Sequence, residues 1–203
     1  MVKRVGIYAG TFDPVHAGHL AFAKKALESC NLDKIFFLVE PRPRRKQGVR
    51  ALEHREAMVR LAIKEQAAFG MIVLEQSNFS VEETLPKLKA LFMGAELYML
   101  LGEDVFTHLN SWPHVESLLS STSFIIGLRS GDETKMQQHL HTIKKVRGIK
   151  FNTSFLVTEY PEISSSKIRL ALKNSQKPTG HLSVLTNYIK KNKLYKDSSV
   201  DES

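Results

Sequence analysis

Two histidines three residues apart, His16 and His19, follow the glycine-bearing segment Gly-Thr-Phe-Asp-Pro at 10–14. The short apolar run 5–9 precedes this segment and a stretch with helical spacing follows it, so the pattern predicts a strand, a turn and a helix. A helix start presents unpaired N–H groups and partial positive charge, which bind phosphate. Imidazoles beside it can hydrogen-bond a phosphoryl group as charge develops there. The segment predicts a nucleotide phosphate site around Gly10, Thr11, Phe12, His16 and His19.

A second candidate anion site is the segment Ile-Ser-Ser-Ser-Lys-Ile-Arg at 163–169. Ser165 and Ser166 at a helix start would offer hydroxyl and N–H groups to an anion. Arg169 can bind phosphate oxygens with two donors. Taken alone, the segment is also compatible with an ordinary helix cap followed by a solvated cationic face.

The ten residues 41–50 carry five cations, Arg42, Arg44, Arg45, Lys46 and Arg50. Clustered cations repel one another unless an anion is near. The segment is interpreted as a clamp that closes on a triphosphate, with a solvated loop or a nucleic-acid patch as alternatives.

Two further positions could contact a nucleotide. Gly102 would allow close approach of a ligand, and the carboxylate of Asp104 could accept hydrogen bonds from a ribose. The alternative is a turn and helix cap. Trp112 could stack on a planar ring, or else be partly buried beneath its own helix.

Composition sets the outer limits. The chain has 203 residues, 42% of them hydrophobic, and a formal charge of +8, which predicts an anionic partner. No apolar run approaches the roughly 18 residues that span a bilayer, and the N-terminus does not resemble a signal peptide. The lone Cys30 favours a reducing compartment, the cytoplasm. Two histidines at this spacing lack the third ligand that zinc requires; no metal site is expected.

Strands and helices alternate along the chain, which predicts a doubly wound α/β sheet, Rossmann-like and parallel, with helices on both faces. Ser80 and Glu83 have capping-box spacing. One domain is expected over 1–196, with a disordered polar tail at 197–203. Strands are expected at 5–9, 35–39, 71–74, 97–101, 123–128 and 151–157. Helices are expected at 19–29, 52–65, 81–91, 112–119, 134–145, 165–173 and 182–193, with a short one after residue 104.

Together these segments resemble the nucleotidyltransferase superfamily with the His-x-Gly-His motif, and most closely the bacterial nicotinate mononucleotide adenylyltransferase family. The resemblance covers nearly the whole chain. It rests on 10–20, Glu-His-Arg-Glu-Ala-Met at 53–58, Leu-Gly-Glu-Asp at 101–104 with Trp112, 163–169 and the C-terminal Leu-Tyr at 194–195.

The resemblance implies attack by the phosphate of a pyridine mononucleotide on the α-phosphorus of ATP, with Mg²⁺ carried by ATP. His16 and His19 would contact the reacting phosphates, with Thr11 and Phe12 lending loop contacts. The other implied contacts with ATP are those of Gly10, Gly102, Asp104, Ser165, Ser166 and Arg169. The implied contacts with the mononucleotide are those of Lys46, Arg45, Thr84 and Trp112. Lys46 and Arg169 would join the two histidines in catalysis.

The chain departs from the family where the pyridine carboxylate is bound. A Ser-Tyr-Thr segment normally precedes Thr84, but this chain has Phe-Ser-Val at 79–81. The residue after Trp112 usually contributes its backbone N–H, and here it is Pro113, which has none. The threonine of that segment is therefore replaced by Val81, unless the register shifts by one and Ser80 substitutes.

Several alternatives remain within these observations. The acceptor could be nicotinamide mononucleotide or phosphopantetheine, or the product could be CDP-linked. A different class is a basic nucleic-acid-binding module built on 41–50 and the C-terminal lysines, since the motif pair is also similar to class I aminoacyl-tRNA synthetases. A non-catalytic nucleotide sensor is a third class. A membrane partner is not expected, and a homo-oligomer stays open.

Overall fold

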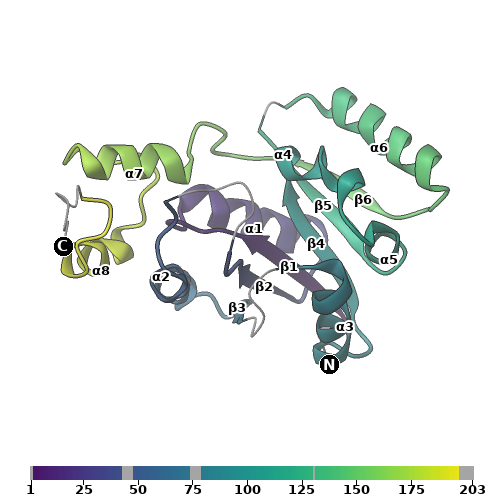
Figure 1. Cartoon of the computed structure of the whole chain (residues 1–203), viewed down its shortest axis with the longest axis horizontal. Coiled ribbons are helices and arrows are strands. Elements are labelled where there is room, and N and C mark those ends of the chain that lie inside the picture. The colour runs from purple at the N-terminus through teal and green to yellow at the C-terminus, as the bar shows by residue number, and fades with distance from the viewer. Residues whose placement is uncertain (1, 43–47, 74–78, 130, 197–203) are drawn as a thin grey trace.

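A computed structural model describes residues 2–42, 48–73, 79–129 and 131–196 of the chain (Figure 1). Six parallel strands form one sheet in the order β3-β2-β1-β4-β5-β6. The strands are β1 (Arg4–Gly10), β2 (Lys34–Val39), β3 (Phe69–Ile72), β4 (Glu96–Gly102), β5 (Ser123–Leu128) and β6 (Thr153–Val157).

Helices fill the connections between the strands and follow the last one. They are α1 (Ala17–Ser29), α2 (Leu52–Ile63), α3 (Val81–Leu91), α4 (Glu103–Phe106), α5 (Val115–Leu119), α6 (Glu133–Arg147), α7 (Ser165–Lys173) and α8 (Thr186–Lys191). Two single turns of 3₁₀-helix, Leu109–Ser111 and Ser183–Leu185, complete the described elements.

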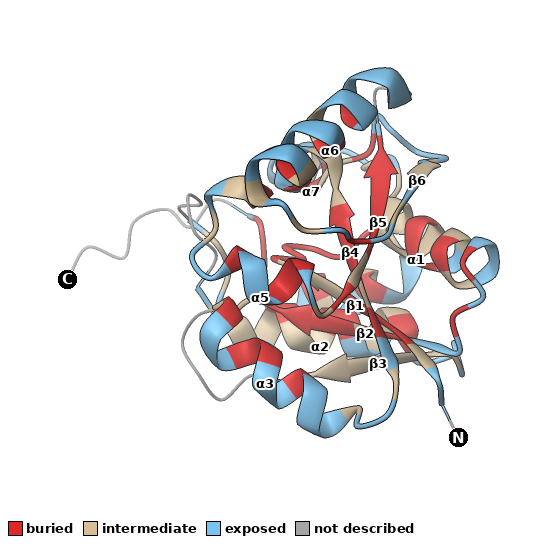
Figure 2. Ribbon diagram, turned by 90° about the vertical axis from the view of Figure 1, so that its right-hand side faces the viewer, coloured by how far each residue is buried: buried red, intermediate tan, exposed pale blue. Residues whose placement is uncertain are grey.

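The sheet separates two hydrophobic cores, because successive side chains of a strand point to opposite faces. Leu97, Met99 and Leu101 of β4 pack in one core with α3, α5 and α6, whereas Leu100 packs in the other with α1, α2 and α8. Figure 2 shows the buried strands between α1 on one side and α3 and α5 on the other. The prediction of a doubly wound parallel sheet is confirmed.

The strand order reverses between β1 and β4, which pair with each other in register from Arg4↔Glu96 to Tyr8↔Leu100. In open α/β sheets the crevice for ligands lies at this reversal, beyond the carboxyl ends of the strands. The connections after Gly10 and Gly102 leave the sheet there, so the fold brings the two glycine turns to one edge.

The expected helix at 112–119 was wrong at its start, because α5 begins only at Val115. Trp112 has an extended backbone (φ −74°, ψ 136°), and a residue before proline is disfavoured in the helical region. His114 has φ +56°, which also precludes a regular helix. The segment 112–114 is therefore an irregular connection, and it leaves the Trp112 side chain partly buried against the core.

Other boundaries differ by a few residues. β3 begins at Phe69 rather than 71, because it pairs with β2 from Ile35↔Phe69 onward. The C-terminal helix is split into a 3₁₀ turn and α8. The expected tail at 197–203 lies outside the described residues.

The predicted helix cap at Ser80 is confirmed, since its Oγ accepts from the Glu83 N–H at 3.1 Å. The return bond of the capping box is made differently from the expectation. The Ser80 N–H donates to Thr84 Oγ1 at 3.2 Å, because residues four apart also share a helix face.

Candidate active site

The turn after β1 is held by an unusual backbone conformation. Phe12 has φ +50°, a left-handed conformation that costs a non-glycine residue roughly 1–2 kcal/mol. The buried Phe12 ring offsets this by packing edge-on against Tyr8 and His19, at centroid distances of 5.4 and 5.0 Å. A Cβ at Gly10 would lie 2.9 Å from the ring, so this turn requires glycine there.

The two histidines lie face to face at the start of α1. Their rings stack with centroids 3.6 Å apart, and the His16 N–H donates to His19 Nδ1 at 3.2 Å. Because Nδ1 accepts, neutral His19 carries its proton on Nε2. A Cβ at Gly18 would lie 3.2 Å from the His16 ring. A larger residue there would crowd the ring, which explains why the motif has glycine at this position.

His16 is a neutral group at physiological pH. Its side chain is buried, and loss of hydration together with the nearby charge of Arg129 lowers its pKa to about 4. Its Nδ1 has no hydrogen-bond partner among the described residues. Such orphaned buried atoms are rare in folded proteins, and this one lies at the phosphate site predicted from sequence.

Arg129 is a candidate that sequence reasoning did not name among the site residues. It follows β5, and its backbone N–H donates to Glu103 Oε2 at 3.1 Å, across the neighbouring strand end. Its positive charge acts on both His16 and Tyr8. The sequence signal was available, because a cation directly after a strand of a parallel sheet lies at the same edge as the other strand ends.

Asp13 and its neighbour Pro14 connect the turn to the first half of α7. Asp13 is 2% exposed, and its carbonyl oxygen accepts from Arg169 Nη1 at 2.7 Å. Ser166 Oγ accepts from Arg169 Nη2 at 3.2 Å, while Ser165 Oγ donates to the Pro14 carbonyl at 2.9 Å. The structure thus brings the second predicted anion segment onto the first, although they are about 150 residues apart.

Arg55 on α2 connects the turn to the two ends of the basic segment, Glu40–Pro41 and Arg50, which together are called the root of that segment. It is 1% exposed and donates to four carbonyl oxygens at 2.7–3.0 Å, those of Thr11, Glu40, Pro41 and Arg50. A buried guanidinium with all its bonds to main chain is a fixed structural element. Sequence reasoning placed Arg55 within a family-like segment and assigned it no role.

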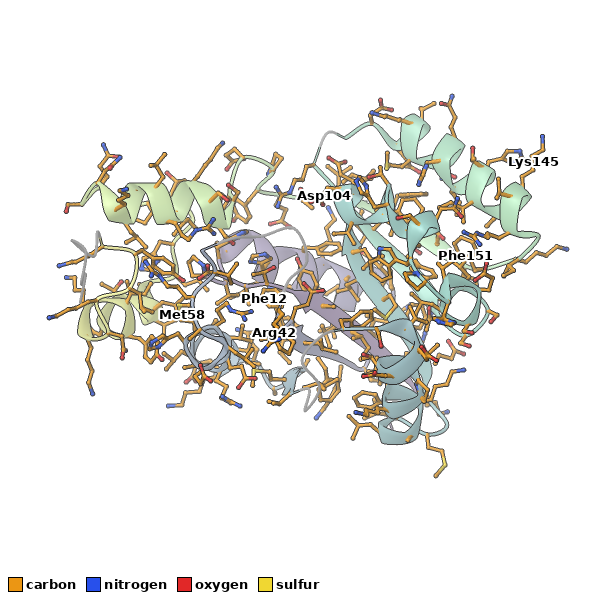
Figure 3. The ribbon with its side chains drawn as sticks, in the orientation of Figure 1. Phe12, Arg42, Met58, Asp104, Lys145 and Phe151 are labelled. Atoms are coloured by element: carbon orange, nitrogen blue, oxygen red, sulfur yellow. The ribbon has the colours of Figure 1, made fainter. Side chains whose placement is uncertain are left out.

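A cavity of about 560 Å³ opens beside the turn. Gly10 and Thr11 of the turn line it, together with Asp104 just after β4 and with Trp112. In Figure 3, Phe12 lies near the middle of the molecule and Asp104 at the end of β4. A Cβ at Gly102 would lie 2.7 Å from Asp104 Oδ1. A larger residue at position 102 would therefore displace the Asp104 carboxylate. The cavity is also lined by Ala9, Glu40, Phe79, Ser80, Val81, Glu82, Leu101, Val105, His108, Ser111, Pro113 and His114.

The end of the cavity near Trp112 has an aromatic wall and an ion pair. The rings of Phe79 and Trp112 meet edge-on with centroids 5.9 Å apart. His114 Nε2 lies 3.3 Å from Glu82 Oε2, and both side chains are more than half exposed. A planar ring would fit against such a wall.

Not every predicted site residue lines the cavity. The described ones outside its lining include Phe12, His16, His19, Gly102, Ser165, Ser166 and Arg169. Thr84 is fully buried within α3, where it accepts the Ser80 N–H, and Ser80 lines the cavity instead. Arg45 and Lys46 lie outside the described residues.

The described part of the chain contains neither a cluster of metal ligands nor a membrane-spanning helix. No group of three or more His, Cys, Asp or Glu there is placed to hold a metal ion. No helix among the described residues is both long enough and apolar enough to cross a membrane.

The cytidylyltransferase-like family model matches residues 7–171. A probable nicotinate-nucleotide adenylyltransferase of Carboxydothermus hydrogenoformans is 31% identical over 95% of this chain and 98% of its own. The nicotinate-nucleotide adenylyltransferase of Bacillus subtilis is 30% identical, covering 96% and 99%. Among solved structures, the Plasmodium falciparum nicotinic acid mononucleotide adenylyltransferase complexed with NaAD superposes with a TM-score of 0.76 at 22% identity, over 95% of this chain and 97% of that one.

Proposed function

The chain belongs to the nicotinate-nucleotide adenylyltransferases of the cytidylyltransferase-like family, and we propose that it transfers the adenylyl group of ATP to nicotinate mononucleotide. The products are deamido-NAD and pyrophosphate, a step of NAD biosynthesis. The observation that carries this proposal is the stacked pair His16 and His19 at the start of α1, beside a cavity that ends in an aromatic wall.

The reaction is an in-line displacement at phosphorus. A phosphate oxygen of the mononucleotide bonds to the α-phosphorus of ATP as the bond to the bridging oxygen of pyrophosphate breaks. The nucleophile is already an anion, so the protein needs no strong base. Its contributions are alignment of the two substrates and stabilisation of charge on the transferring group.

His19 is proposed to donate its Nε2–H to the α-phosphate. This assignment is supported by the bond from the His16 N–H to Nδ1, which fixes the tautomer and the ring together. His16 contributes as a neutral imidazole, since its pKa is lowered to about 4. Because the ring is already neutral, its charge does not change as the pH passes through 7, and neither does its contact with a phosphate.

Arg169 and Ser166, with Ser165 at the same helix start, are proposed to hold the β- and γ-phosphates. Lys46, with Arg45, would approach from the basic segment. Magnesium enters as part of the substrate, because triphosphate oxygens are ligands that Mg²⁺ prefers. The magnesium ion would neutralise the part of the negative charge on the phosphates that Arg169 does not balance.

The other end of the cavity is proposed to hold the mononucleotide, with its ring on Trp112. Gly102 and Asp104 line the ribose region of ATP. Val81 has no side-chain donor and Pro113 has no N–H, so Ser80 is the proposed partner of the pyridine carboxylate, in place of Thr84. The support for this exchange is that Ser80 lines the cavity and Thr84 does not.

The proposed catalytic domain is 1–196. A cytoplasmic location is part of the same proposal and is supported by Cys30 being the one cysteine of the sequence.

The test is pyrophosphate release from MgATP with nicotinate mononucleotide, nicotinamide mononucleotide and phosphopantetheine in parallel assays. We expect release with nicotinate mononucleotide. Release only with another acceptor would refute the assigned substrate and keep adenylyl transfer. No release with any of the three would refute adenylyl transfer to these acceptors and favour a nucleic-acid-binding role.

A further inference from the structure

Tyr195, in the last described turn of the chain, is buried against the catalytic turn. Its side chain is 3% exposed, and its hydroxyl donates to Asp13 Oδ1 at 2.5 Å, across 182 residues of sequence. Burial and the negative charge of Asp13 raise the pKa of the Tyr195 hydroxyl, so the hydroxyl stays protonated and remains a donor. This bond carries no role in the reaction described above.

Asp13 is the point where four segments meet. One carboxylate oxygen accepts from Tyr195, and the other accepts from the Arg50 N–H at 3.2 Å. Its carbonyl oxygen accepts from Arg169 at 2.7 Å. The same residue therefore links the turn before the histidines, the root of the basic segment, the phosphate-binding end of α7 and the C-terminal turn.

The orientation of Asp13 depends on having a donor for each carboxylate oxygen. A buried carboxylate that loses one of two hydrogen bonds is left partly unsatisfied, and rotation to recover a partner would disturb the other contacts. The contacts at risk are those to Arg169, which holds ATP phosphates under the proposed function, and to the backbone of Arg50, where the basic segment ends.

We propose that Tyr195 is a positioning residue for ATP: through Asp13, its hydroxyl fixes Arg169 and the root of the basic segment at the spacing that the triphosphate requires. This inference rests on the proposed function for its link to catalysis. The inference assigns the C-terminal turn a role at the phosphate site. None of the residues that bond Asp13 belongs to 79–82 or 112–114, the segments at the mononucleotide end of the cavity.

The hydroxyl can be removed without removing the ring. Tyr195→Phe keeps the buried ring and its contact with the Arg50 guanidinium, which lies 5.4 Å from the ring centroid. The chain supplies a matched control, Tyr188→Phe. Tyr188 OH bonds His54 Nδ1 at 2.9 Å, so this variant also loses one hydroxyl bond between the C-terminal segment and the body of the protein. Asp13 keeps both donors to its carboxylate in this variant.

The experiment measures the Kd of MgATP by calorimetry, the KM of each substrate and the melting temperature for both variants and the parent chain. We expect Tyr195→Phe to weaken MgATP about fivefold, in Kd and in KM, since one bond to a charged group is lost. The KM of nicotinate mononucleotide should stay within about twofold, because that end of the cavity keeps its contacts. Tyr188→Phe should leave the Kd of MgATP unchanged.

Equal shifts of the MgATP Kd in the two variants, or none in either, would overturn the inference. A rise in both KM values together would also overturn it, because a general loss of structure has that signature. A parent chain that binds MgATP but releases no pyrophosphate refutes the proposed function alone, since the Kd comparison still reports on Tyr195. Should Tyr195→Phe not fold, Asp13→Asn, which keeps the shape of the side chain, is expected to weaken MgATP by a similar factor, and an unchanged Kd there would refute the inference.

Discussion

The two ends of the cavity are built differently. At the phosphate end, where the turn at 10–16 lies against the start of α7, the supporting groups Arg55 and Asp13 are buried and bonded to main chain of distant segments. The groups that they support, His19 and Arg169, are half-buried. At the mononucleotide end, formed by 79–82 and 112–114, the polar groups are largely exposed, and the pair Glu82 and His114 is held by one contact of 3.3 Å.

This difference corresponds to two kinds of task. Charge stabilisation works best with groups that are already oriented and need no reorganisation during the reaction, which buried main-chain bonding provides. Discrimination between acceptors depends on a few contacts to the variable part of the substrate. Exposed groups on helix starts and irregular connections can change there without disturbing the core. We therefore expect large effects of substitution at the phosphate end and small, selective ones at the other.

The largest effect is expected for His19. His19→Asn keeps an acceptor for the His16 N–H, because Asn Oδ1 can take the place of Nδ1, and removes only the Nε2 donor. We expect turnover to fall about 10²–10³-fold, the usual loss when one donor to a developing charge is removed. Steady-state kinetics with MgATP measures it.

His141→Ala provides the control for His19, since His141 lies on the exposed face of α6, and it should leave turnover unchanged. Near-normal turnover in His19→Asn would contradict the proposed donor role. It would also weaken the distinction between the two ends, because the imidazole that the His16 N–H orients would then contribute nothing.

The next effect is on stability and concerns Arg55. Arg55→Ala leaves carbonyl oxygens of three segments without their buried donor, and we expect a loss of about 3 kcal/mol in the free energy of unfolding. Arg60→Ala on the same helix removes only the pair with Glu56, in which the Arg60 side chain is 55% exposed, and should cost less than about 1 kcal/mol. Urea unfolding measures both, and equal midpoints would show that the phosphate end is not held by Arg55.

The features predicted correctly from sequence were those set by short-range spacing. The strand, turn and helix around His16 and His19 follow from local pattern, as does the cap at Ser80. The start of α5 was missed although the proline rule was available at Pro113. The burial of Thr84 was missed because periodicity gives a helix face but not its depth.

Long-range contacts could not be predicted. Nothing in the sequence near Asp13 indicates Tyr195, which is 182 residues away, and nothing near Arg55 indicates which carbonyl oxygens it meets. These contacts depend on how the elements pack after the chain has folded. The site was therefore predictable as a set of phosphate-binding segments, and the network that orients them was not.

The smallest effect is expected at the mononucleotide end, for the pair Glu82 and His114. A nicotinate carboxylate bound near Glu82 is repelled by it, and the contact of His114 Nε2 with Glu82 Oε2 offsets that repulsion. His114→Ala should lower the ratio of kcat/KM for nicotinate over nicotinamide mononucleotide about threefold, since exposed ion pairs contribute only ~0.2–1 kcal/mol. Competition between the two acceptors measures the ratio.

Glu82→Gln should move the same ratio in the opposite direction, because it removes the repelling charge and leaves His114 in place. The double variant should return close to the parent ratio. Both shifts should shrink in high salt, as the screening length falls from about 10 Å at 0.1 M to about 3 Å at 1 M. If neither variant changes the ratio, the pair lies away from the pyridine substituent. Recognition of the acceptor would then rest on Ser80 and the ring of Trp112, and the mononucleotide end would be as fixed in its chemistry as the phosphate end.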